Sequence, residues 1–314
     1  MKRSEFIAQF AGGGFALAAA PQSEEGPFPK PDVFVERTQA GKPHAGKVLA
    51  AIQPHADDLP IFAGGLVFKL IHEGYTGYMI RTTNDDHTGP GTVAEGVLAN
   101  ERDTQAVSKA FGLQKLYDLN YRNHMLDAVS PLELRVRLIF IFRLLKVDTV
   151  ICYDPWSHYE ENPDHYCTAS AVEAACWMAG GSKDYIEHFD AGLKPHSVKE
   201  KYYFARGPQY VNRVVDIGDY MDQKISVNLL NTAQGPSGNT GAQLRRRLSE
   251  QGLHLPLLGN DDDTANRAYT RQFVLERDAD TGKRYGLQYG EAYHYIGPES
   301  AKVEDYVRRN AVKV

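Results

Sequence analysis

Hydrophobic and polar positions alternate along this chain in a way that predicts strands and helices in turn from about Lys47 onward. Short continuous apolar runs predict buried strands, and longer segments with apolar residues three to four positions apart predict helices. The expected strands in the first half are 47–53, 78–83, 114–120 and 149–153, and the helices between them are 59–73, 93–111 and 131–146. This order is typical of a Rossmann-like three-layer α/β/α fold with a mostly parallel sheet.

The second half continues the alternation, with an expected helix at 166–178, strands at 200–205 and 213–217, and helices at 219–231 and 240–251. The segments Asp261–Asp263 and Asp278–Gly282 are expected in surface loops. No internal repeat is visible. We therefore expect one domain over residues 45–300, followed by a C-terminal tail at 301–314.

The first 20 residues read as a signal peptide, because Lys2 and Arg3 precede an apolar stretch of small residues. Residues 21–44 are rich in Pro, Glu, Lys and Gly and are expected to be a linker. These features predict an exported protein, periplasmic or extracellular; if the segment is instead a disordered tail, the protein would be cytoplasmic. The apolar stretch is too short and Gly-rich for stable membrane insertion.

The composition and charge of the chain limit the kinds of partner it can bind. The net charge is -5, from 35 Lys+Arg against 40 Asp+Glu, and the one short basic cluster, Arg245–Arg247, falls in an amphipathic helix pattern. These features argue against a nucleic-acid partner and favour a solvated helix face. Three cysteines without metal-binding spacing argue against a structural thiolate site.

Candidate chemistry begins at Gln53–Leu59, QPHADDL, directly after the strand 47–53. Ligands of parallel sheets bind where strands end. His55 and Asp58 can converge on one point there, and imidazole with carboxylate is a common ligand pair for zinc. Asp57 would then be a free carboxylate beside the metal. The alternative is that one of the two aspartates caps the following helix.

A second polar cluster, Tyr153–Tyr166, follows the strand 149–153 and precedes the helix 166–178. It therefore lies at the same edge of the predicted sheet as the first motif. It could supply a third ligand and leave one coordination position open for water, as a catalytic zinc requires.

The two motifs in this order, Pro54–Asp58 and later Asn162–His165, resemble those of the PIG-L/LmbE-like deacetylases. That family includes the deacetylases of N-acetylglucosaminyl-phosphatidylinositol and of the mycothiol precursor. The similarity extends over roughly 47–296 and includes Asn100–Arg102, Val214–Ile217 with Lys224, and Gly290–Tyr293.

The resemblance implies one zinc ion, or another divalent metal, held by His55, Asp58 and His165. It makes Asp57 the general base, which takes a proton from water and returns it to the leaving amine. Asp164 is expected to hold a ligand histidine in its metal-binding tautomer.

The sequence departs from the family at Asn162, where a histidine that stabilises the oxyanion is expected. Asparagine can donate a hydrogen bond but carries no charge. Zinc alone, or His158 or Tyr159 from the same loop, could take over the task. Roles as a surface histidine and a packing aromatic remain open for these two residues.

The loop Asn84–Gly91 follows the strand 78–83 at the same edge. By the resemblance, Asp85, Asp86 and Arg102 would contact the sugar. The alternatives are a solvated loop with a surface arginine, or a second metal at Asp85, Asp86 and His87.

The predicted protein is a zinc-dependent hydrolase that deacetylates an N-acetylated, GlcNAc-type sugar or sugar conjugate. Two alternatives stay open: an amidase for a larger acyl group or a thiol-sugar conjugate, and a carbohydrate-binding relative impaired in turnover. Asn162 is the feature that supports the second alternative.

Overall fold

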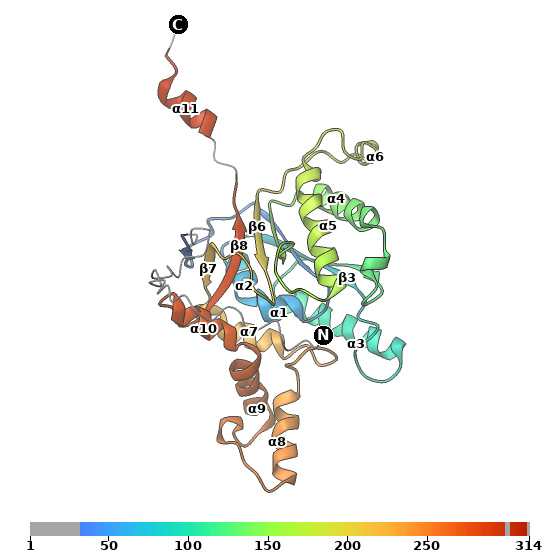
Figure 1. The fold of residues 1–314 in the computed structure, drawn as a ribbon, viewed down its shortest axis with the longest axis vertical. Coiled ribbons are helices and arrows are strands. Elements are labelled where there is room, and N and C mark those ends of the chain that lie inside the picture. The colour runs from blue at the N-terminus through green and yellow to red at the C-terminus, as the bar shows by residue number, and fades with distance from the viewer. Residues whose placement is uncertain (1–31, 299–301, 313–314) are drawn as a thin grey trace, which may run out of the picture. The chain divides into compact units, whose positions relative to one another are not determined.

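The computed structural model describes residues 32–298 and 302–312 (Figure 1). The predicted signal peptide and residues 21–31 of the predicted linker lie outside the described residues. Within the described part, none of the helices combines the length and the apolar character that a bilayer crossing requires.

One eight-stranded sheet forms the centre, in the order β1-β7-β8-β6-β5-β2-β3-β4. Its strands are β1 Phe34–Glu36, β2 Val48–Gln53, β3 Thr76–Thr83, β4 Leu116–Tyr121, β5 Thr149–Tyr153, β6 Glu200–Phe204, β7 Arg213–Asp216 and β8 Gly290–Ile296. Only β8 runs antiparallel to its neighbours, β6 and β7. The mostly parallel sheet that the sequence predicted is confirmed.

Helices cover the sheet on two sides. The α-helices are α1 Asp58–Phe62, α2 Gly64–His72, α3 Val93–Ala110, α4 Pro131–Leu145, α5 Pro163–Ala179, α6 Glu187–Asp190, α7 Met221–Asn228, α8 Thr240–Glu250, α9 Asp262–Tyr269, α10 Glu276–Arg284 and α11 Lys302–Asn310. Short turns of other helix types occur at η1 Leu126–Ala128, η2 Gly218–Tyr220, η3 Pro256–Leu258 and η4 Thr270–Val274. Helices α4 and α5 pack together, and α7 packs on α2 and α3. Right-handed crossovers place these two groups on opposite faces, which confirms the three-layer architecture.

The strand order fixes where a ligand can bind. From β2 the chain moves through β3 to β4 in one direction, and from β5 it moves to β6 in the other. Strands β2 and β5 are neighbours and are buried along almost their whole length. Their carboxyl ends therefore flank the crevice at the topological switch point, where α/β proteins bind ligands.

Three features of the structure were not predicted from the sequence. β1 lies inside the predicted linker and pairs with β7, so the sheet takes a strand from before Lys47. The single helix expected at 59–73 is two helices, because the chain leaves helical geometry at Ala63. The segment 302–310, predicted as tail, is helical.

The prediction of surface loops at Asp261–Asp263 and Asp278–Gly282 is also wrong. Asp261 caps α9, since its side chain accepts a hydrogen bond from the Thr264 N–H, so Asp262 and Asp263 are helical. Asp278 lies buried in α10 beside Lys224. Gly290–Tyr293 is part of β8. The helices α9 and α10 are so polar that their sequences resemble loops.

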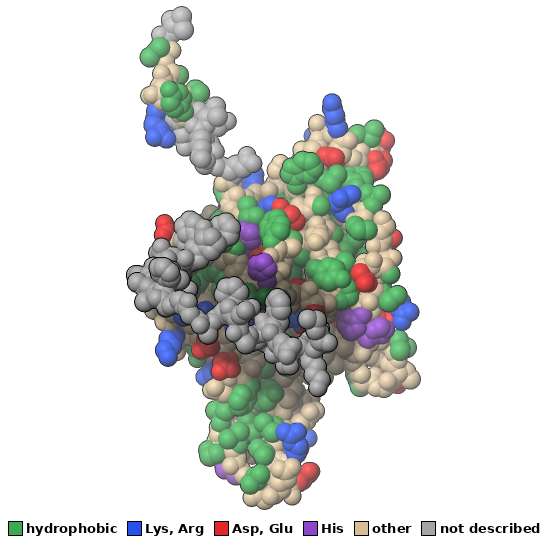
Figure 2. Space-filling model, in the orientation of Figure 1, with side chains coloured by type: hydrophobic (Ala, Val, Ile, Leu, Met, Phe, Trp, Pro, Cys, Tyr) green, Lys and Arg blue, Asp and Glu red, His purple; other side chains and the backbone are tan. Residues whose placement is uncertain are grey.

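Helices α8 and α9 pack against each other, and the connection between them carries exposed hydrophobic side chains, which lie in the lower part of the molecule in Figure 2. They include Leu253, Leu255 and Leu257 in the connection between the helices. Arg245 donates to Asp262 Oδ1 at 2.7 Å, and Arg246 pairs with the same carboxylate. These two arginines therefore link α8 to α9.

Candidate active site

The first motif forms a tight loop between the end of β2 and the start of α1. Asp58 Oδ2 accepts a hydrogen bond from the backbone N–H of His55 at 2.9 Å. The hydroxyl of Tyr153, at the end of β5, donates to Asp58 Oδ1 at 2.7 Å. Because both oxygens are held, the Asp58 carboxylate has a fixed orientation.

The second motif forms the first turn of α5. Asn162 caps this helix, since its Oδ1 accepts a hydrogen bond from the Asp164 N–H at 2.9 Å, and Pro163 begins the helix without needing a partner for a backbone donor. The ring of His165 stacks on the ring of Tyr153, with centroids 4.1 Å apart and planes 17° from parallel. Tyr153 thus positions side chains from both motifs.

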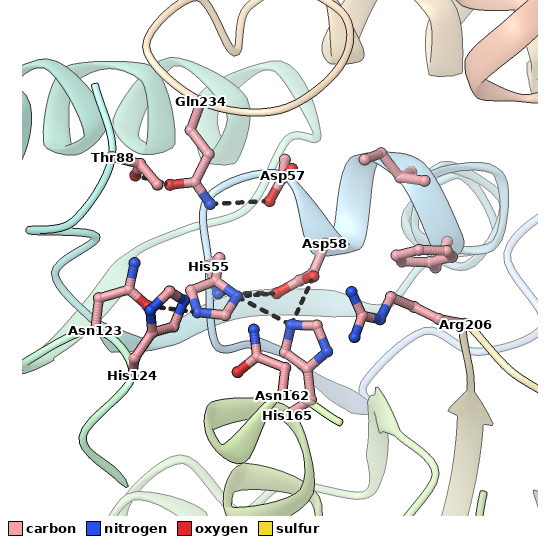
Figure 3. A pocket seen from close by; sticks show the side chains of 12 residues that line it. His55, Asp57, Asp58, Thr88, Asn123, His124, Asn162, His165, Arg206 and Gln234 are labelled. Carbon is pink, nitrogen blue, oxygen red and sulfur yellow. Dashed lines mark hydrogen bonds and ion pairs between the residues drawn. The ribbon is translucent and has the colours of Figure 1, made fainter. Parts of the chain in front are cut away.

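Three of the predicted metal ligands converge (Figure 3). His55 Nδ1 lies 3.0 Å from His165 Nε2 and 3.4 Å from Asp58 Oδ2, and His165 Nε2 lies 3.6 Å from Asp58 Oδ1. Ligand atoms about 2.0–2.2 Å from a tetrahedral zinc ion are about 3.3–3.6 Å from one another. The two distances to Asp58 lie in this range and the distance between the two nitrogens is slightly shorter, so His55, Asp58 and His165 could hold one small divalent cation after a small outward shift of the rings.

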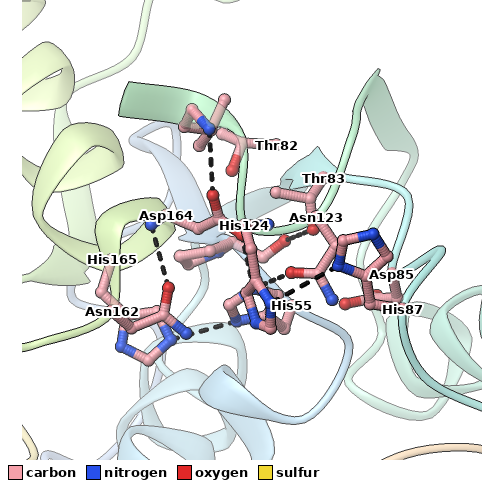
Figure 4. Close-up of polar contacts among 12 residues, drawn as sticks. His55, Thr82, Thr83, Asp85, His87, Asn123, His124, Asn162, Asp164 and His165 are labelled. Carbon is pink, nitrogen blue, oxygen red and sulfur yellow. Dashed lines mark hydrogen bonds and ion pairs between the residues drawn. The ribbon is translucent and has the colours of Figure 1, made fainter. Parts of the chain in front are cut away.

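The contacts of the outer ring nitrogens support the same conclusion (Figure 4). His55 Nε2 lies 2.9 Å from Asn123 Oδ1 and 3.1 Å from Asp164 Oδ2. His165 Nδ1 lies 3.2 Å from Glu160 Oε1, at an angle too poor for a regular hydrogen bond. Acceptors at the outer nitrogens favour a proton there, which directs the lone pairs of the inner nitrogens toward each other. A cation between these two nitrogens would accept both lone pairs.

The Asp164 carboxylate is held by backbone amides as well as by the His55 ring. It accepts hydrogen bonds from the backbone N–H of His124 at 2.6 Å and of Leu126 at 3.2 Å. Burial opposes its ionisation, but the hydrogen bonds from His55 and from these amides outweigh that effect and lower the pKa of Asp164. It is an ionised carboxylate in contact with His55, the arrangement expected of a group that orients a ligand histidine.

Glu160 has the corresponding position behind His165. Arg206 donates to both oxygens of Glu160, from Nη2 at 2.5 Å and from Nε at 3.1 Å. Burial opposes the charged form, but His165 and Arg206 more than offset it and lower the pKa of Glu160 to about 2. Each histidine of the cluster therefore has an ionised carboxylate at its outer nitrogen.

Asp57 occupies the N-cap position of α1, but its side chain makes no capping hydrogen bond. Its Oδ1 instead accepts a hydrogen bond from Gln234 Nε2 at 3.1 Å. Burial, together with the nearby charge of Asp58, raises the pKa of Asp57. A carboxylate that is neither a cap nor a member of the metal cluster is available for proton transfer.

These groups line one pocket of about 300 Å³ at the carboxyl ends of the strands. The lining residues are His55, Asp57, Asp58, Ile61, Phe62, Thr88, Asn123, His124, Asn162, His165, Arg206 and Gln234. The pocket brings together both motifs, which follow the neighbouring strands β2 and β5, with residues from later in the chain.

Three residues proposed from the sequence lie elsewhere. His158 and Tyr159 are exposed, and Tyr159 retains 90 % of its possible exposure. The backbone N–H of His158 donates to Pro208 O, so this part of the loop turns away from the pocket. Arg102 is on the exposed side of α3. None of the three is among the residues that line the pocket.

Asp85 and Asp86 are close to the site but do not line this pocket. Asp85 is fully buried, accepts from the Ala56 N–H at 3.2 Å and from Arg81 at 3.1 Å, and burial raises its pKa to about 7. Asp86 accepts from Arg122 at 2.8 Å and from the Asn123 N–H at 2.9 Å. Both carboxylates accept hydrogen bonds that hold neighbouring loops together. Within the described residues, they do not form a metal-binding group with His87.

Several residues of the site were not identified from the sequence. They are Asn123, His124, Arg206 and Gln234 in the pocket, and Glu160 behind His165. Glu160 falls in the second polar cluster and follows a strand end, which is a usable signal. The others stand in irregular segments that no periodic pattern links to the motifs.

With this geometry in place, comparison with known proteins is informative. Residues 50–176 match the PIG-L family model, described as GlcNAc-PI de-N-acetylase. The chain therefore resembles the PIG-L deacetylases over this segment. It is also 29 % identical over 194 residues to diacetylchitobiose deacetylase of Thermococcus kodakarensis, a match that covers 60 % of this chain and 71 % of that relative.

Solved structures show that this chain has a known fold. The N,N'-diacetylchitobiose deacetylase from Pyrococcus horikoshii matches with a TM-score of 0.65 at 22 % identity, over 82 % of this chain and 88 % of that chain. GalB, the 4-carboxy-2-hydroxymuconate hydratase from Pseudomonas putida, matches with a TM-score of 0.58 at 16 % identity, over 81 % and 98 %. At these identities the similarity establishes the fold, and the function has to be argued from the site.

Proposed function

We propose that this protein is a metal-dependent N-deacetylase that releases acetate from a GlcNAc-type sugar or sugar conjugate. The observation that carries the proposal is the convergence of His55, Asp58 and His165 on one point of a pocket whose wall presents Asp57 outside the ligand set. The family, and a relative named diacetylchitobiose deacetylase, support this reaction.

The ligand set of two imidazoles and one carboxylate suits zinc, which is the metal we propose. When bound, such an ion polarises the acetamide carbonyl and lowers the pKa of a water molecule. Asp57 accepts the proton of the attacking water and later donates it to the leaving nitrogen, so that the C–N bond breaks to give acetate and an amine. Asp164 and Glu160 keep the two histidines oriented throughout.

The size of the pocket favours acetyl over a larger acyl group. Its volume of about 300 Å³ is at the small end of the range for ligand sites. Ile61 and Phe62 supply an apolar wall within it, which suits a methyl group. The rest of a longer glycan would extend outside the pocket.

Chelation should abolish activity reversibly. We expect metal-loaded protein to release acetate from N,N'-diacetylchitobiose or another N-acetylated sugar of a panel, and to lose that activity when dialysed against a chelator. Zinc at one equivalent per chain should restore it, because the site holds one ion. Acetate would be measured enzymatically and metal by elemental analysis.

The matched control is His165→Ala, which should take up little zinc and stay inactive after zinc is added. Acetate release that persists after metal removal would contradict the proposal. Sugar binding without turnover by fully loaded protein would favour the carbohydrate-binding alternative.

Asn162 is the residue we propose as the neutral hydrogen-bond donor to the oxyanion. Its Oδ1 is occupied by the helix cap, which turns the amide nitrogen toward the histidine cluster (Figure 3). His158 and Tyr159, the replacements suggested by the sequence, lie outside the pocket. Asparagine at this position therefore combines a cap with a donor.

Asn162→Ser separates these two roles. Serine is a good N-cap, so the melting temperature should stay near that of the wild type, whereas the amide donor is lost. We expect kcat to fall by about 10²–10³-fold with little change in KM, since the donor acts mainly in the transition state. Steady-state kinetics and thermal unfolding would be measured together.

The controls for this experiment are His158→Ala and Tyr159→Ala, which should retain kcat. If Asn162→Ser keeps full activity, Asn162 is not the donor, and His124 and Arg206, two chargeable side chains that line the same pocket, become the candidates.

A further inference from the structure

Gln234 holds Asp57 from a part of the chain that is remote from both motifs. It lies in the connection between α7 and α8, and its Nε2 donates a hydrogen bond to Asp57 Oδ1 at 3.1 Å. Its Oε1 accepts a hydrogen bond from the Thr88 hydroxyl (Figure 3). Because an ionised carboxylate only accepts hydrogen bonds, the nitrogen must face Asp57, and Thr88 holds the other end of the amide.

The loop that carries Gln234 is anchored independently of the pocket. Asp103 on α3 accepts hydrogen bonds from the backbone N–H groups of Thr232, at 2.6 Å, and Ala233, at 2.8 Å. The Thr232 hydroxyl also donates to Asp103, at 3.1 Å. These bonds fix the loop immediately before Gln234, so the amide approaches Asp57 from a set direction.

Gly235, the next residue, packs against the other side of the Asp57 side chain. Gly235 has a φ of +91°, and a Cβ at this position would lie 2.8 Å from Asp57 Oδ2 and 2.9 Å from Asp57 Cβ. Any residue other than glycine would therefore displace the carboxylate or the loop. The loop backbone packs directly against Asp57.

We propose that Gln234 is a positioning residue for the general base: it fixes the rotation of the Asp57 carboxylate, while the Gly235 backbone packs against the other oxygen. The inference rests on the proposed role of Asp57. A carboxylate rotates easily about its last torsion, and proton transfer requires a set direction and distance. A small misplacement of a catalytic group can cost about 10²-fold in rate.

Gln234→Met tests this with a side chain of similar length that cannot hydrogen-bond. We expect kcat to fall by about 10–10²-fold, KM to change less than about twofold, and zinc content to stay at the wild-type level. Gly235→Ala should show the same pattern. The matched control is Gln223→Met on the exposed side of α7, which should retain wild-type kinetics.

A double-mutant cycle distinguishes positioning from a separate role. If Gln234 acts through Asp57, then Gln234→Met should lower kcat in the wild-type background but hardly change it in an Asp57→Asn background. An equal loss in both backgrounds would overturn the inference, because it would mean that Gln234 contacts substrate or supports the fold on its own account.

The cycle also keeps the inference distinct from the proposed function. If Asp57→Asn loses activity and Gln234→Met does not, the positioning role is wrong and the base assignment stands. If Asp57→Asn retains wild-type kcat, both are wrong.

Discussion

Replacing Asp57 with asparagine should lower kcat by about 10²–10⁴-fold while the protein keeps its metal. The amide has nearly the same shape as the carboxylate and can still meet Gln234, but it cannot accept a proton. Asp57 is also not needed for metal binding, because the converging atoms belong to His55, Asp58 and His165. Steady-state kinetics and elemental analysis on the same preparation would test both statements.

Asp58→Asn is the control at the neighbouring position. Both oxygens of Asp58 are held, and both lie within 3.6 Å of a histidine nitrogen of the cluster. Removing its charge should therefore weaken metal binding, and the activity should fall for that reason. If Asp57→Asn strips the metal and Asp58→Asn does not, the two roles are exchanged.

Much of this site was predictable because it depends on strand ends. His55 and Asp58 follow β2 and His165 follows β5, and the carboxyl ends of neighbouring parallel strands must lie at one edge of the sheet. Hydrophobic runs identify these strands reliably, since both are buried. The resemblance to a family then assigned roles that spacing alone left open.

The residues that position the predicted ligands and Asp57 were harder to predict from the sequence. Gln234 comes 177 residues after Asp57, and neither periodicity nor a motif connects the two positions. Asp85 was expected to contact the sugar, with a solvated loop as the alternative, whereas its carboxylate is buried against Arg81 and the Ala56 N–H. The positions of Gln234 and Asp85 both depend on tertiary contacts that the sequence pattern does not show.

The similarity of the fold to both a deacetylase and a hydratase shows how little the sheet alone determines. In the proposed mechanism, the reaction depends on the three metal-ligand side chains and on the position of Asp57. Both depend on α1, which begins at Asp58 and is followed directly by α2. The stability of these helices therefore bears on catalysis.

Lys224 is central to that stability, and replacing it with methionine should lower the free energy of unfolding by about 3–5 kcal/mol. Its side chain is 0 % exposed, and Nζ donates to Asp278 Oδ2 at 2.5 Å and to Glu291 Oε1 at 2.7 Å. Glu291 also accepts the N–H groups of Gly65 and Leu66, both at 2.8 Å, which fixes the start of α2. Methionine fills a similar volume but leaves two buried carboxylates without their cation.

Arg271→Met is the matched control, because Arg271 pairs with Asp222 at 2.7 Å on the surface, with side chains 50 % and 78 % exposed. It should cost less than about 1 kcal/mol in urea unfolding. Adding Asp278→Asn to Lys224→Met should recover part of the loss, since one buried charge is then removed. Equal small losses for Lys224→Met and Arg271→Met would show instead that the buried carboxylates are stabilised without the lysine, and that the link between β8 and α2 through Glu291 is maintained by backbone hydrogen bonds.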